Sequence, residues 1–188
     1  MRATGFGAMF AKLCCLTPVL TSKEMIVATA TKTQFKRNIL EGETNEQVTS
    51  LLQDNLTNLV DLALLLKQAH WNVFGPNFRS IHLQLDEIIV TVRAASDEVA
   101  ERIVALGAPA DGRSSTVAQN SDLDGYPSDF VDVRSTITQV ADATKTAIDA
   151  MRAAIEKLGE LDPITEDLLI GISGSMEKHL WMLQAQEA

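Results

Sequence analysis

The stretch KQAHWNVFGPNFRSIHLQLDEIIVTVRAASDEVAERIV, residues 67–104, decides how this chain is organised. Apolar residues recur at helical spacing on both sides of the FGPN segment at residues 74–77, which breaks the pattern. Metal-ligand side chains are spread over the two halves: His70, His82, Asp86, Asp97 and Glu101. The stretch therefore predicts two helices that together carry five side chains of the types that bind metals.

The same periodicity extends these two helices outward. The first is predicted from about residue 44 to residue 71, and Thr44 with Gln47 matches a capping box at its start. The second is predicted over residues 77–106, with Gly107 ending it.

Residues 107–126 are rich in Gly, Ser, Asp and Pro and are too long for a tight turn, so we expect a crossover with a short helix near 114–120. A third helix is predicted over 127–158, opened by a proline and stopped by Gly159. A fourth follows at 163–184. No segment shows a strand pattern. Four long helices with one long crossover predict an all-α, ferritin-like four-helix bundle rather than an up-down-up-down bundle.

Composition favours a single domain that does not enter a membrane. The chain has 188 residues, 46% of them hydrophobic, and its apolar runs are far shorter than the roughly 18 residues of a membrane-spanning helix. We expect the domain to occupy residues 44–188 and the protein to be cytoplasmic. Cys14 and Cys15 are adjacent and provide no disulfide framework.

Residues 1–43 lack sustained periodicity and are predicted to form a mobile basic arm. A short helical piece near residues 35–40 is one option within this arm. A secretion signal fits poorly because Lys12 and Pro18 interrupt the apolar region, and translation from Met25 is an alternative. The formal net charge is −9, but residues 1–37 carry six basic residues against one acidic residue, so this segment is basic and the rest of the chain is strongly acidic. An acidic body repels nucleic acid and attracts cations.

His82, Asp86, Asp97 and Glu101 share one face of the predicted second helix, within about 100° of each other at about 100° per residue. A charged stripe of this kind is either solvated surface or a binding site. Asp86 and Asp97 are separated by eleven residues, or about 16 Å along the helix. One helix therefore cannot place all four side chains around one ion.

Two copies of this helix, packed antiparallel across a twofold axis, would bring the His82/Asp86 end of one copy to the Asp97/Glu101 end of the other. Each dimer would then contain two identical sites, with His70 as a further ligand if the first helix reaches the same level. Imidazole and carboxylate ligands with open positions suit iron.

A di-iron site within a single chain, as in ferritins, requires glutamate three residues before a histidine on two helices. The residues three before the histidines are Lys67, Arg79 and Met176. The sequence therefore excludes that type of site.

From about residue 45 to its end the chain resembles the Dps family, the miniferritins named as DNA-binding proteins from starved cells. The resemblance rests on K-Q-x-H-W-N at 67–72, a histidine and an aspartate four residues apart at His82 and Asp86, and D-x-x-A-E-R at 97–102. It implies a homododecameric hollow shell that oxidises Fe(II), preferably with hydrogen peroxide and otherwise with dioxygen. The ferric mineral would be stored inside, which protects DNA from oxidative damage.

The resemblance also assigns roles. His70, His82 and Asp86 would come from one subunit and Asp97 and Glu101 from its twofold partner. Asp86 would bridge two irons, and Glu101 with a histidine would hold the tighter one. Trp71 would be either a trap for stray oxidising equivalents or a core aromatic residue.

Three further candidates are weaker. His179 is interpreted as an ordinary packing or surface histidine. Asp142 and Asp149, seven residues apart on the third helix, line either an iron-uptake pore or a solvated face. Lys32, Lys36 and Arg37 would contact DNA if the arm binds it, and a nucleoid-compacting structural protein is the alternative function. Twelve such arms would act multivalently and with strong salt dependence.

Overall fold

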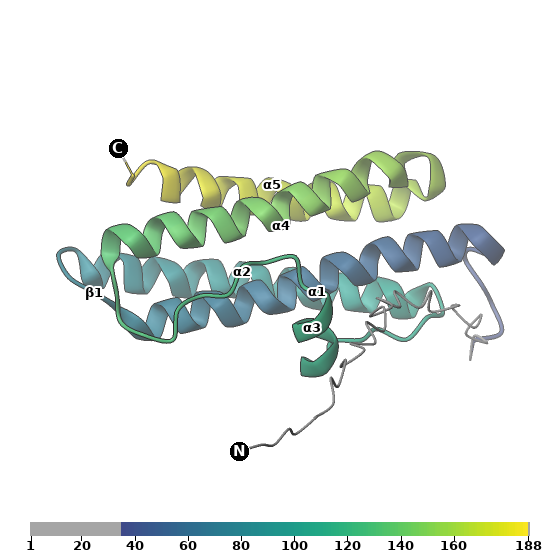
Figure 1. Ribbon diagram of the computed structural model, residues 1–188. Helices are drawn as coiled ribbons and strands as arrows, with labels where there is room; N and C mark the ends of the chain where they lie inside the picture. Colours follow the sequence, from purple (N-terminus) through teal and green to yellow (C-terminus); the bar gives the residue numbers. More distant parts are fainter. Residues whose placement is uncertain (1–34, 188) are drawn as a thin grey trace, which may run out of the picture.

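The computed structural model describes residues 35–187, and four long helices packed side by side make up most of it (Figure 1). The long helices are α1 (Gly42–Asn72), α2 (Phe78–Ala105), α4 (Val133–Leu161) and α5 (Pro163–Gln184). The crossover between α2 and α4 contains the short helix α3 (Ser114–Asn120), and two-residue strands β1 (Val73–Phe74) and β2 (Val131–Asp132) pair with each other. The predicted all-α bundle with its long crossover is confirmed.

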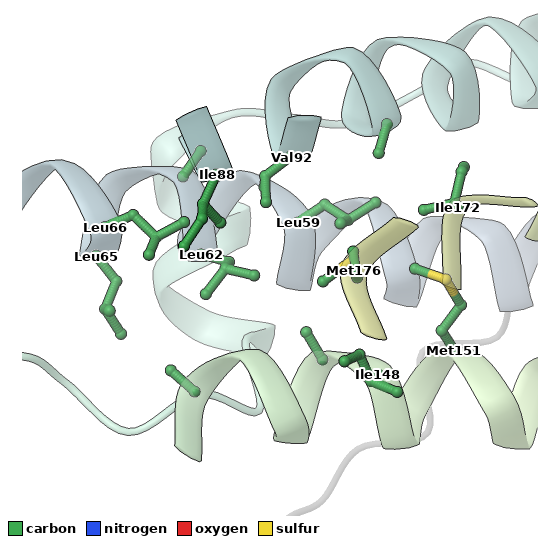
Figure 2. Close-up of a cluster of buried hydrophobic side chains, with 14 of the residues drawn as sticks. Leu59, Leu62, Leu65, Leu66, Ile88, Val92, Ile148, Met151, Ile172 and Met176 are labelled. Atoms are coloured by element: carbon green, nitrogen blue, oxygen red, sulfur yellow. The ribbon is translucent and has the colours of Figure 1, made fainter. Parts of the chain in front are cut away.

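The core fills the space between the four long helices (Figure 2). Helices α1 and α2 pack as one hairpin and α4 and α5 as another, and α1 also packs on α4. Each long helix contributes fully buried side chains, including Leu62 of α1, Ile88 of α2, Met151 of α4 and Leu169 of α5. Burying such a side chain stabilises the fold by about 1.5–3 kcal/mol, so this core holds the helices in register.

The strand pair shows why the predicted start of the third helix is wrong. Val73 pairs with Val131 and Phe74 with Asp132 in parallel register, which requires extended backbone where residues 127–132 were expected to be helical. Helix α4 begins only at Val133, and the Asp132 carboxylate caps it by accepting from two backbone N–H groups at 3.0 and 3.2 Å. Two residues are too few to show a strand period in the sequence, so the expectation of no strand is also wrong.

The predicted end of the third helix is wrong for a packing reason. Helix α4 continues through Gly159 to Leu161, and a Cβ atom at residue 159 would lie 3.1 Å from Oε1 of Glu166. The glycine therefore allows close approach of the α4–α5 turn instead of stopping the helix.

Two predictions near the start of α1 are also wrong. The capping box does not form, because Glu41 is the N-cap residue, without a side-chain cap, and Gln47 Nε2 donates to Glu43 Oε1 at 3.0 Å. Residues 35–40 are not helical. The predictions for α3 and α5 are confirmed, as is the end of α2 at Gly107, whose φ of 90° is left-handed.

No helix within residues 35–187 combines the length and the apolar character needed to cross a membrane. The predictions on the secretion signal, the two cysteines and Lys32 concern positions outside the described residues.

Candidate metal centre

His70 and His82 lie against each other where α1 ends and α2 begins. Their ring centroids are 3.7 Å apart and their planes are inclined by 20°. The chain reverses between the two helices through left-handed backbone at Gly75, with φ of 112°, and at Asn77, with φ of 63°. The first helix thus reaches the level of His82, as the site prediction required.

Reciprocal hydrogen bonds fix both imidazoles. His70 Nδ1 donates to the His82 carbonyl at 2.8 Å, and His82 Nδ1 donates to the His70 carbonyl at 3.0 Å. A carbonyl oxygen only accepts, so each neutral ring carries its proton on Nδ1 and keeps the Nε2 lone pair for a metal. Hydrogen bonds of this kind orient metal-ligating histidines and set their tautomer.

Asp86, one helical turn beyond His82, lies at the same place and is paired with a cation. Its Oδ1 accepts from Lys67 Nζ at 2.6 Å and lies 3.5 Å from His70 Nδ1. The hydrogen bond from Lys67 lowers the pKa of Asp86 below its ordinary value and outweighs the opposing effect of burial. The carboxylate is therefore ionised at neutral pH and paired with the Lys67 ammonium group.

The side chains of Asp97 and Glu101 are exposed on α2 and form no hydrogen bond or ion pair within residues 35–187. They lie roughly 16 Å and more from Asp86 along the helix. Across the described part of the chain, no three His, Cys, Asp or Glu groups come together to hold a metal. One subunit by itself therefore has no complete metal site. His70, His82 and Asp86 lie near the start of α2 and are called the histidine half below, and Asp97 and Glu101 lie near its end and are called the carboxylate half.

The two halves are symmetric along α2. The interval from His82 to Asp86 equals the interval from Asp97 to Glu101, so the pattern is palindromic about the point between Thr91 and Val92. A second α2, rotated by a twofold axis through that point, would place its Glu101 opposite His82 and its Asp97 opposite Asp86.

The face of α2 that carries these ligands also exposes large apolar side chains: Leu83 at 45%, Val90 at 71% and Val104 at 42%. A single chain leaves this stripe uncovered.

Comparison with known proteins shows to which family the chain belongs. Residues 49–187 match the Ferritin-like domain family. The "DNA protection during starvation protein" of Mycolicibacterium smegmatis is 36% identical over 153 residues, which cover 81% of this chain and 84% of the relative. The chain belongs to the Dps family of ferritin-like proteins.

Solved Dps structures agree with the fold. A Mycobacterium smegmatis Dps in a tetragonal form has a TM-score of 0.78 at 35% identity, covering 82% of this chain and 94% of that one. A Microbacterium arborescens Dps in a high iron form has a TM-score of 0.76 at 33% identity, covering 80% and 98%.

The sequence analysis assigned no role to two residues that contact the candidate metal centre. Lys67 belongs to the quoted motif, yet only the structure shows its contact with Asp86. Phe78 lies four residues before His82, and its ring centroid is 5.0 Å from that imidazole. The spacing of four residues on a helix was the available signal. Trp71 is 66% exposed, so its interpretation as a core aromatic residue is wrong for this chain.

The remaining candidates lie elsewhere. His179 Nε2 is 2.9 Å from Thr91 Oγ1, between α5 and α2, while its Nδ1 is buried without a partner within residues 35–187. It is a packing histidine, as predicted. Asp142 and Asp149 are exposed on α4, and Asp149 pairs with Lys145 at 2.6 Å, so their pore role stays a prediction.

Lys36 and Arg37 are exposed just before α1. Their contact with DNA also stays a prediction, since a single chain without nucleic acid does not test it.

Proposed function

We propose that this protein is a ferroxidase and iron store that assembles as a homododecameric shell and oxidises Fe(II) at di-iron sites between twofold-related subunits. The palindromic ligand pattern on α2 carries this proposal, because it forms two complete sites only when a second α2 packs antiparallel. The orientation of His70 and His82 supports it further, because their Nδ1 atoms are engaged by backbone carbonyls and the Nε2 atoms are left for a metal.

The residues supply a mixed ligand set for the substrate iron. His70 and His82 provide nitrogen donors and Asp86 a bridging carboxylate, while Asp97 and Glu101 come from the partner. Two Fe(II) ions give up one electron each, and hydrogen peroxide accepts both with two protons to yield two waters. Because no single-electron step is needed, hydroxyl radical is not released. With dioxygen as oxidant, the same two electrons and two protons reduce it to hydrogen peroxide, which a second pair of Fe(II) ions reduces to water.

The relatives support the iron chemistry and the protective role. One is named for DNA protection during starvation, and one similar structure is described as a high iron form. An acidic body attracts Fe(II) to the shell, and Asp142 and Asp149 would line its uptake pore. Assembly in the cytoplasm would give a particle of about 245 kDa, twelve times 20.4 kDa.

Sizing of the purified protein followed by anaerobic Fe(II) loading and peroxide addition tests the proposal. We expect a rapid ferric absorbance from a shell of the stated mass. Replacing both His70 and His82 by Ala should leave the shell intact and slow oxidation strongly, whereas Glu98→Gln, an exposed neighbour on α2, should behave like wild type. Unchanged oxidation in the histidine variant would refute the site assignment.

A second function, DNA binding through the arm, is favoured by the exposed Lys36 and Arg37 and by the basic residues before them. Glu41, Glu43 and Glu46 follow directly and oppose it. A gel-shift series at increasing salt, with the full chain and a chain starting at residue 38, tests this role. Retention of DNA by the truncated shell would contradict it.

A further inference from the structure

Arg102 follows Glu101 directly on α2, yet its side chain points into the bundle instead of toward the carboxylate half. Arg102 Nη2 donates to Asp162 Oδ2 at 2.6 Å, and Arg102 Nε donates to Thr165 Oγ1 at 2.9 Å. The Thr165 hydroxyl donates in turn to the same Asp162 oxygen. The Arg102 and Asp162 side chains are only 14% and 7% exposed, and Thr165 is fully buried.

These contacts join the end of α2 to the other hairpin. Asp162 is the residue between α4 and α5, and Thr165 lies in the first turn of α5. Figure 1 shows the α4–α5 turn at the right-hand end of the bundle, toward which α2 also runs. The closed set of Arg102, Asp162 and Thr165, called the clamp below, therefore fixes where α2 ends relative to α4 and α5.

The position of that end matters for metal binding. Glu101 lies four residues before the end of α2 at Ala105, and helix ends fray unless they are held. A metal site requires its ligands to be held within about 0.5 Å of the productive geometry. The histidine half is held by its own reciprocal hydrogen bonds, whereas Asp97 and Glu101 have no such bonds within residues 35–187. Of the side-chain hydrogen bonds that join α2 to other helices within residues 35–187, those of the clamp lie nearest in sequence to Asp97 and Glu101.

We propose that Arg102 is a positioning residue for the metal centre: through Asp162 and Thr165 it places Glu101 and Asp97 for the partner's histidine half before iron binds. This inference rests on the proposed inter-subunit site. Arginine is needed because its fork donates to two acceptors at once from Nε and Nη2, whereas a lysine ammonium is a single point on a flexible stem.

The test compares Arg102→Gln and Arg102→Lys with wild type in the assembled shell. Anaerobic titration with Co(II), followed by its visible absorbance, measures site occupancy without iron oxidation. We expect Arg102→Gln to raise the Co(II) Kd and the KM for Fe(II) by about tenfold or more, as the loss of supporting contacts around metal ligands does. Arg102→Lys should be intermediate, and kcat at saturating Fe(II) should change little.

Lost stability alone must be separated from lost positioning. Ile148 is buried in the α4 core and lies far along the chain from the ligands. Ile148→Val should lower Tm slightly and Ile148→Ala should lower it more, so the two variants provide the matched controls. If Arg102→Gln does not fold, Thr165→Val, which removes one hydroxyl at constant shape, should shift both constants in the same direction. A Kd and KM equal to those of the Ile148 control at matched Tm would overturn the role of Arg102. Wild-type protein that binds no Co(II) would overturn the inter-subunit site as well.

Discussion

Two defective subunits should restore activity to each other if every site is built from two chains. One chain carries His70→Ala and His82→Ala, which destroys its histidine half, and the other carries Asp97→Asn and Glu101→Gln, which destroys its carboxylate half. Ala and the two amides keep α2 helical, because none is a helix breaker. Each chain alone would form a shell in which every site lacks two ligands.

The twofold geometry sets the size of the recovery. In a mixed dimer, one site combines the intact histidine half of the second chain with the intact carboxylate half of the first. The other site combines both defective halves. Random pairing of equal amounts makes half of all dimers mixed, so about a quarter of all sites are complete. We therefore expect about a quarter of the wild-type rate of Fe(II) oxidation from the mixture.

Co-expression with two different affinity tags and sequential purification yields shells that contain both chains, and peroxide-driven ferric absorbance measures the rate. A matched control pairs the histidine-defective chain with Asp86→Asn. Both defects then lie in the histidine half, so no complete site forms and no recovery is expected. A rate in the first mixture equal to the average of its parents would refute the inter-subunit site, and recovery in the control would refute the placement of Asp86.

Three further results are expected. Lys67→Met should tighten Co(II) binding, because Asp86 Oδ1 no longer has to exchange an ammonium for the metal; weaker binding in the titration would contradict this. Burial lowers the pKa of His179, Lys178 adds to the shift, and Glu87 opposes it. The contribution of His179 to stability is therefore complete above the ordinary histidine pKa of 6.5, and it is lost as the pH falls below that value. His179→Gln should flatten the fall in Tm between about pH 7.5 and pH 5.5, and an unchanged slope would contradict this. Burial opposes ionisation of Asp162, but hydrogen bonds from Thr165 and Arg102 outweigh burial and lower the pKa of Asp162 below 3.8. Asp162→Asn should therefore lower the free energy of unfolding at neutral pH by about 1–3 kcal/mol. In denaturant melts below pH 3.8, the variant should lose stability less steeply than wild type as the pH falls.

The helices were predictable because their apolar spacing is a local property of the chain. The predicted bounds of α3 and α5 agree with the structure, and those of α2 differ by one residue at each end. Errors arose where a distant segment decides the local conformation. Proline at 127 is a sound helix start by itself, but the pairing of residues 131–132 with 73–74 requires extended backbone. Gly159 is likewise a sound stop, and only the approach of Glu166 explains why the helix continues.

Spacing on α2 singled out four of the five candidate ligand residues, and His70 joined them on the condition that α1 reaches the same level. The surroundings of these side chains were not predictable. Nothing local indicates that His70 and His82 exchange hydrogen bonds through each other's carbonyls, because this requires α1 and α2 to meet at one level. The contact of Lys67 with Asp86 depends on the same meeting. Sequence reasoning therefore proposed which groups bind the metal, and the structure adds how those of the histidine half are oriented.

The ammonium of Lys67 at a cation site has a physical explanation in the proposed dimer. Antiparallel packing of two α2 helices brings Asp86 of one subunit opposite Asp97 of the other, with Glu101 one turn away. Without iron, these carboxylates repel each other across the interface. Lys67 pairs with Asp86 at 2.6 Å and would reduce that repulsion before metal is present, and an arriving Fe(II) would then replace one cation by another. Because the lysine stem is long and a quarter of its side chain is exposed, it could withdraw into solvent when the metal binds, so in the proposed dimer the same residue would support assembly of the empty shell and leave the site free for its substrate.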